Sequence, residues 1–147
     1  MKTFLAFATI LTVFAVFACN KDKFQTKPRI EIKDYNSKEI HENQSLVIRM
    51  NYFDKEGDLG QAPITGIINR INLLPVSPGL DKADTIRSAL PVFPDKDNGE
   101  ISFRLEYGFL KESIIENDTL VFKFTVTDRA GNSSDTITSD KVIIHLP

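Results

Sequence analysis

The chain has 147 residues, and its 18 lysines and arginines nearly balance its 20 aspartates and glutamates, which gives a net charge of −2. This is the length of one domain, large enough to bury a hydrophobic core without disulfides. The mild acidity and the scattered basic residues argue against a nucleic-acid partner. Cys19 is the single cysteine, so it has no partner for an internal disulfide.

The first residues of the chain have the pattern of an export signal. Lys2 precedes an uncharged, mostly apolar run, Thr3–Ala18, and Cys19 follows directly. A positive start, a short apolar stretch and a small residue at the cleavage position are typical of a secretory signal. A transmembrane helix needs about 20 apolar residues, so a membrane anchor is the weaker alternative. Simple secretion without lipid is the other alternative.

The segment Val16–Cys19 resembles a bacterial lipoprotein signal, in which the cysteine receives lipid and becomes the mature N-terminus. The resemblance implies a signal peptide over residues 1–18, a lipid-anchored tether over 19–28 and a domain over 29–147. It also implies attachment to the outer membrane through lipid on Cys19, with more than one acyl chain for stable anchoring. Asn20–Asp22 partly resembles the export tag of Bacteroidota surface lipoproteins, which leaves the periplasmic and surface-exposed sides both open.

From Arg29 onward, apolar and polar residues alternate in short stretches separated by turn residues, the pattern of half-buried β-strands. Pro91 and Pro94 limit one of these stretches to an edge strand. The predicted strands are Arg29–Lys33, Ser45–Phe53, Ile67–Val76, Thr85–Leu90, Ile101–Tyr107, Leu120–Thr127 and Lys141–Leu146. This arrangement predicts an all-β protein, an immunoglobulin-like β-sandwich of about seven antiparallel strands.

Two segments also resemble known domains. Phe53–Gly60 is similar to the acidic turn after the second strand in immunoglobulin-like domains of Bacteroidota lipoproteins. Thr125–Asn132 is similar to the closing hairpin of bacterial immunoglobulin-like and cadherin-like repeats. The resemblance implies a cell-envelope module for binding, adhesion or assembly, with a protein or glycan partner. Phe122 and Phe124 stand where antibody domains carry the tyrosine corner and second cysteine, so packing alone must join the sheets.

An acidic loop follows the predicted second strand and contains Asp54, Glu56 and Asp58. In an immunoglobulin topology, this loop and the loop of the final hairpin lie at the same end, so Asp128 and Asn132 are expected nearby. Hard cations such as Ca²⁺ bind several oxygen ligands on flexible loops. The five residues are therefore a candidate calcium site. The alternative is that they only form turns and that the protein has no cofactor.

Three threonines follow an aspartate and precede an aliphatic residue: Thr85, Thr119 and Thr136. The pattern resembles the acceptor motif for O-glycosylation of exported Bacteroidota proteins. The alternative is ordinary strand initiation, because a turn aspartate followed by a β-branched residue is common where a strand begins.

The sequence contains no recognisable catalytic motif, so we expect a protein that is not an enzyme. His41 precedes a predicted strand and His145 lies at the end of one, so both are expected to be solvated or rim residues rather than bases. Two other hypotheses are a glycan-binding accessory lipoprotein and an envelope enzyme or inhibitor. An exposed pair of aromatic side chains would favour the first, and a cleft with a buried carboxylate would favour the second.

Overall fold

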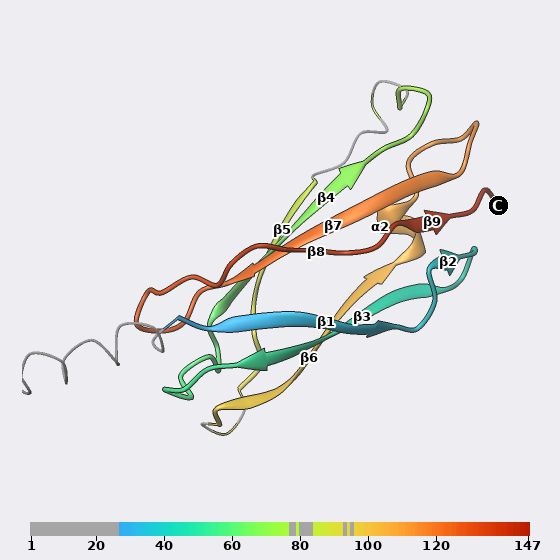
Figure 1. Cartoon of the computed structure of the whole chain (residues 1–147). Helices are drawn as coiled ribbons and strands as arrows, with labels where there is room; N and C mark the ends of the chain where they lie inside the picture. Colours follow the sequence, from blue (N-terminus) through green and yellow to red (C-terminus); the bar gives the residue numbers. More distant parts are fainter. Residues whose placement is uncertain (1–26, 77–78, 80–83, 93, 95) are drawn as a thin grey trace, which may run out of the picture.

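The structure is a computed structural model that describes residues 27–76, 79, 84–92, 94 and 96–147. The predicted signal peptide, Cys19 and most of the tether lie outside the described residues. Within the described part, two β-sheets pack face to face as an all-β sandwich, which confirms the predicted fold class (Figure 1). No helix in that part is long and apolar enough to cross a membrane.

The first sheet has three antiparallel strands in the order β1-β3-β6. Their bounds are Arg29–Tyr35 for β1, Ser45–Phe53 for β3 and Asn98–Glu106 for β6. The second sheet has the order β2-β9-β7-β4-β5, with β8 paired to β7. Its bounds are Glu39–Ile40 for β2, Pro63–Arg70 for β4, Thr85–Ala89 for β5, Asp118–Val126 for β7, Ile137–Thr138 for β8 and Val142–Ile144 for β9. These orders match the A-B-E and G-F-C strands of immunoglobulin domains.

The core lies between the two sheets, as the alternating sequence pattern predicts. Every second residue of β7 is buried, and Phe122 and Phe124 are fully enclosed. Phe124 meets Phe103 of the opposite sheet edge to face, with ring centroids 5.0 Å apart. Gly66 of β4 is the cross-strand partner of Phe124, and its missing side chain leaves room for both rings. Aromatic packing of this kind joins the sheets without a disulfide.

The fourth strand is the main correction to the predicted elements. β4 covers Pro63–Arg70 rather than Ile67–Val76. Its pairing with β7 runs from Ile64 to Arg70, and the residues beyond turn outward. Gly66 conceals the alternation in the sequence because a glycine at a buried position carries no apolar signal. Ile71, Leu73 and Leu74, which follow Arg70, gave the sequence a strand-like pattern although their side chains are exposed.

Smaller differences concern the ends of elements. β6 begins at Asn98 and stops at Glu106, where the chain makes one helical turn, α2 (Tyr107–Leu110), that was not predicted. The two-residue strands β2 and β8 were also missed, since a pair of residues shows no periodicity. β2 runs parallel to β9, with Ile40 opposite Ile144. The short edge strand β5 was predicted correctly.

Candidate functional sites

Three carboxylates from two loops come together at one end of the sandwich. Asp54 and Asp58 lie on the β3–β4 loop, and Asp128 lies on the loop after β7 (Figure 1). Each offers one oxygen, and these oxygens lie within 4.8 Å of one another. The topology therefore brings together three of the five residues that the sequence proposed for a cation. We call Asp54, Asp58 and Asp128 the carboxylate cluster.

Asp54 is more deeply buried than Asp58, with 2% of its surface exposed. One carboxylate oxygen, Oδ2, accepts a hydrogen bond from the backbone N–H of Asp58 at 2.8 Å. The other, Oδ1, is buried without a hydrogen-bond partner. Burial raises the pKa of Asp54, and the nearby Asp58 carboxyl and the charge of Glu56 raise it further, against the lowering effect of the Asp58 N–H.

The other two members differ in how well they are satisfied. Asp58 Oδ1 is buried and also lacks a hydrogen-bond partner. Asp128 uses both oxygens, since Oδ1 accepts from Asn132 N at 2.7 Å and Oδ2 from Asn132 Nδ2 at 2.9 Å. Arg129 joins the loops from outside, because its Nε donates to the carbonyl of Asp58 at 3.0 Å. The cluster thus combines a complete turn with two unsatisfied oxygens.

Glu56 and Asn132, the other two predicted ligands, lie outside the carboxylate cluster. Glu56 is exposed and does not belong to the cluster. Asn132 lies close by but directs its amide N–H at Asp128, as a residue that closes a turn does. Gly57 and Gly131 adopt positive φ angles of 68° and 91°, so both loops bend sharply at these points. Turn formation therefore explains part of the acidic pattern.

The three threonines of the predicted O-glycosylation motif differ in their exposure to solvent. Thr85 and Thr136 are exposed, whereas Thr119 is half-buried and its N–H donates to the Asn72 side chain at 2.9 Å. Exposure suits Thr85 and Thr136 for modification better than Thr119. Whether any of the three carries a glycan stays a prediction.

Asp118 forms a buried ionic network that the sequence did not reveal. Its carboxylate is fully enclosed and contacts Arg70 at 2.8 Å and Lys111 at 3.1 Å. It also accepts hydrogen bonds from Glu112 N at 2.8 Å and from Asn72 Nδ2 at 2.7 Å. Burial alone would raise the pKa of Asp118, but these hydrogen bonds and the charge of Arg70 outweigh it and lower the pKa. The network fixes the α2–β7 loop against β4.

Two histidines far apart in the sequence lie side by side. The rings of His41 and His145 stack with centroids 4.2 Å apart and 7° between their planes. Glu39 Oε2 lies 3.4 Å from His145 Nε2. The parallel pairing of β2 with β9 creates this contact, because residues 40 and 144 are partners and the next residues follow them. His41 is exposed and His145 half-buried, near the predicted rim positions.

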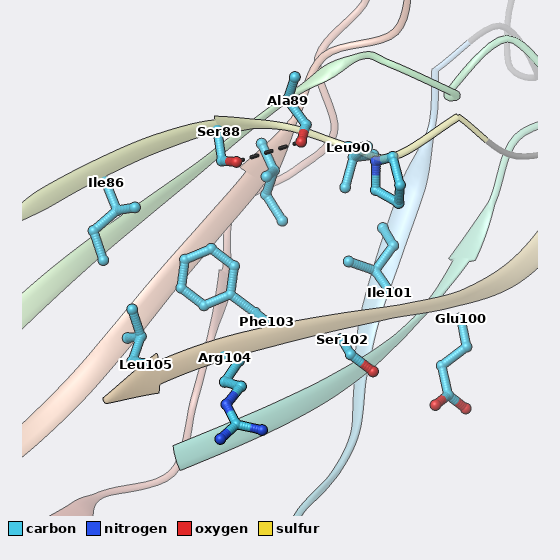
Figure 2. Close-up of a pocket in the computed structure, with 12 residues that line it drawn as sticks. Ile86, Ser88, Ala89, Leu90, Glu100, Ile101, Ser102, Phe103, Arg104 and Leu105 are labelled. Atoms are coloured by element: carbon cyan, nitrogen blue, oxygen red, sulfur yellow. Dashed lines mark hydrogen bonds between the residues drawn. The ribbon is translucent and has the colours of Figure 1, made fainter. Parts of the chain in front are cut away.

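A groove of about 560 Å³ runs between β5 of one sheet and β6 of the other. Figure 2 shows Ile86 of β5 and Phe103 of β6 pointing toward each other across it. Leu105 and Ile101 extend the apolar lining along β6, while Glu100, Ser102 and Arg104 lie on the opposite side of that strand. The two sheets are therefore open at this side, where β5 and β6 are both edge strands.

Comparisons with known proteins identify no family for this chain. No family model matches it, and no curated protein matches it. A β-glucosidase from Listeria innocua in complex with glucose aligns at 10% identity and a TM-score of 0.39, over 81% of this chain and 16% of the glucosidase. The soluble domain of PmoD from a Methylocystis species aligns at 18% identity and a TM-score of 0.31, over 79% and 89% of the two chains. Likenesses this distant carry no functional argument.

Proposed function

We propose that the protein is a lipid-anchored cell-envelope module that binds an extended segment of another envelope protein along the free edge of β5. The anchor is inferred from the sequence, in which Cys19 follows the apolar run Thr3–Ala18. Residues 20–28 are polar and span at most about 30 Å when extended, so they would hold the domain close to the membrane. The observation that supports binding is the exposed edge strand beside the groove.

Within the part of the chain that the structure describes, no strand pairs with the outer edge of β5, so this edge offers backbone hydrogen bonds. Leu90 N donates to Ala62 O at 2.8 Å, on the side that faces β4. Ladder bonds alternate along an antiparallel strand, so every second residue from Leu90 faces β4 and the residues between face outward. The outward-facing N–H groups belong to Thr85, Arg87 and Ala89. A strand from another chain would pair with these groups, as in β-strand addition.

The groove supplies the apolar surface that such a strand would cover. Side chains of an added strand alternate between two faces, so every second one would enter the space between Ile86 and Phe103. Backbone pairing gives affinity for any extended chain, and the shape of the groove gives preference for apolar side chains at alternate positions. An extended, partly apolar protein segment is therefore the ligand that fits best.

The structure gives less support to the other hypotheses. A glycan platform needs a pair of exposed aromatic rings, but the exposed Phe53 and Phe109 lie at opposite ends of the first sheet, and Tyr52 is 4% exposed. Tyr35 and Tyr107 are half-buried, with hydroxyls that contact Asp140 N and His145 O. An enzyme needs reactive groups in its cleft, yet the ionisable residues that line the groove, Glu100 and Arg104, lie on the far side of β6. Both hypotheses therefore rank below protein binding.

The anchor is tested by replacing Cys19 with serine in cells that make the full-length protein. We expect the parent protein to partition with membranes and the C19S variant to remain unprocessed or become soluble. If the C19S variant is still cleaved after Ala18 and still partitions with membranes, lipid on Cys19 is not the anchor.

Strand addition is tested by Arg87→Pro, with Arg87→Ala as its matched control. Proline removes an N–H that faces outward and keeps the bonds to β4, and edge strands tolerate it at such positions. The tagged full-length variants are cross-linked in cells, and the envelope proteins that co-purify are quantified by mass spectrometry. We expect a set of proteins with the parent and Arg87→Ala that is lost with Arg87→Pro, at unchanged melting temperature. Equal recovery with Arg87→Pro contradicts the proposal.

A further inference from the structure

We infer that the carboxylate cluster of Asp54, Asp58 and Asp128 is a Ca²⁺ site that fastens the β3–β4 loop to the loop after β7. The inference does not depend on the proposed binding function or on the lipid anchor. It rests on the oxygens that the protein itself leaves unsatisfied.

The cluster gathers negative charge where water is largely excluded. Asp54 and Asp128 are 2% and 4% exposed, and Asp58 is half-buried. An ionised carboxylate is costly to bury unless a positive group or hydrogen-bond donors compensate it. Here Oδ1 of Asp54 and Oδ1 of Asp58 are both buried, and neither accepts a hydrogen bond from the described residues. Buried polar atoms in folded proteins are nearly always paired, so two such atoms in one cluster require an explanation.

Turn formation does not provide that explanation. The turn of the β3–β4 loop uses Oδ2 of Asp54, which accepts from the backbone of Asp58. The turn after β7 uses both oxygens of Asp128, which accept from Asn132. The turn contacts therefore do not involve Oδ1 of Asp54 or Oδ1 of Asp58. The unsatisfied atoms are the ones that distinguish a ligand site from a pair of ordinary acidic turns.

Asp118 provides an internal comparison in the same chain. It is as buried as Asp54, but Arg70, Lys111 and Asn72 contact its oxygens directly. Where the protein buries a carboxylate for structural reasons, it therefore supplies cations and donors of its own. Among the described residues no cation or N–H group contacts Oδ1 of Asp54, and the side chain beside it is the acidic Asp58, which favours a cation from solution as the partner of both.

The chemistry of the cluster favours calcium. Carboxylate oxygens are ligands for hard cations, and Ca²⁺ accepts six to eight of them in flexible geometry. The three oxygens lie within 4.8 Å of one another, a separation that one Ca²⁺ can bridge with bonds of about 2.3–2.6 Å. Mg²⁺ demands near-ideal octahedral geometry and keeps several of its waters, so carboxylates on two loops suit Ca²⁺ better. Water and backbone carbonyls would complete its shell.

A cation here would link parts of the chain that are distant in sequence. Asp58 and Asp128 belong to loops about 70 residues apart, of which the first joins the two sheets and the second joins β7 to β8 within the second sheet. Phe53, directly before Asp54, pairs with Arg29 at the start of β1. The site therefore lies beside the point where the tether enters the domain, and bound Ca²⁺ would strengthen that end of the sandwich.

The test measures the melting midpoint of the purified full-length protein in EDTA and in millimolar CaCl₂. At a hundredfold excess over the dissociation constant, we expect Ca²⁺ to raise the parent midpoint by roughly 10 °C. Asp54→Asn and Asp58→Asn should lose most of this shift. Glu56→Gln is the matched control, because it removes one exposed charge from the same loop and should keep the shift. Asn at position 54 retains an oxygen for the Asp58 N–H, so folding should survive.

Binding is also measured directly with Tb³⁺, which substitutes for Ca²⁺ and emits when a nearby tyrosine is excited. Tyr52 stands two residues before Asp54 on β3, so we expect sensitised emission that CaCl₂ displaces and that Asp58→Asn abolishes. An unchanged parent midpoint in CaCl₂ overturns the proposal. A shift of equal size in Asp54→Asn and Asp58→Asn also overturns it, because the ion would then bind elsewhere.

Discussion

Phe124 and Lys123 are neighbours on β7, and truncating them should have very different effects. Phe124 is fully buried, whereas Lys123 is half-buried and points to the other face of its sheet. Replacing a buried phenylalanine with alanine costs about 3–5 kcal/mol in stability. The upper part of that range applies here, because Phe124 also loses its edge-to-face contact with Phe103. Lys123→Ala should stay within about 0.5 kcal/mol of the parent.

The difference should be visible in equilibrium unfolding by urea, followed by far-ultraviolet circular dichroism. A loss of about 4 kcal/mol lowers the midpoint by about 2–3 M if the denaturant slope lies between 1.5 and 2 kcal/mol/M, a typical value for small proteins. A domain with a typical free energy of unfolding, about 5–15 kcal/mol, would then lose a large part of it. Lys123→Ala should shift the midpoint by a few tenths of a molar at most.

Equal midpoints for the two variants would refute the assignment of Phe124 to the inter-sheet core. A lower slope for Phe124→Ala would indicate a changed denatured or native state, and the midpoint would then be compared with the thermal transition. Phe122→Ala is a second check, because Phe122 is also fully buried and stacks at 6.2 Å from Phe124. It should resemble Phe124→Ala rather than Lys123→Ala.

Three further predictions concern residues whose role follows from packing or charge. Gly66→Ala places a Cβ 3.2 Å from the Phe124 ring and should cost about 1–3 kcal/mol in urea unfolding, so an unchanged midpoint would contradict this packing. Gly99→Ala places a Cβ 2.7 Å from the Tyr52 ring and should lower the melting midpoint while a change at exposed Gly108 does not. The lowered pKa of Asp118 means that its stabilising effect is present above pH about 4 and is lost as the pH falls through the folded value. Asp118→Asn should therefore be less stable at pH 7 but lose less stability between pH 4 and pH 2, and parallel pH profiles would refute this.

The strands that the sequence predicted well are those whose buried positions all carry large apolar residues. In β3, and in β7 from Leu120 onward, every second residue is leucine, isoleucine, phenylalanine, valine, methionine or tyrosine, and the pattern has one interpretation. The first residue of β7, Asp118, is buried but polar, so the strand was predicted to begin two residues late. β4 places Gly66 at the centre of its buried face, so its signal is interrupted and the strand was placed too late. β2 and β8 are two residues long and form by pairing with β9 and β7, so no local sequence pattern reveals them.

The candidate site was predictable to the extent that topology determines it. An immunoglobulin-like connection places the β3–β4 loop and the loop after β7 at the same end, so the approach of Asp128 to Asp54 and Asp58 followed from the fold class. The exclusion of Glu56 did not, because the direction of a side chain within a loop depends on its backbone angles. Gly57 at φ 68° turns the loop directly after Glu56, which is exposed. Sequence spacing alone treats these carboxylates as equivalent.

Asp54 and Asp118 show why burial by itself does not define the role of an acidic residue. Asp54 directly follows β3 and Asp118 begins β7, and both are buried in the described part of the chain. Lys111 and the Glu112 N–H contact Asp118 from the preceding loop, but Arg70 and Asn72 lie more than 45 residues away, so the sequence shows only part of this compensation. Their environments predict opposite responses to neutralisation. Asp118→Asn breaks an existing network and should destabilise the protein with or without calcium. Asp54→Asn removes an uncompensated charge, so it should be harmless or stabilising in EDTA and costly only in CaCl₂. A loss of equal size in both solutions would mean that Asp54, like Asp118, is compensated within the protein itself.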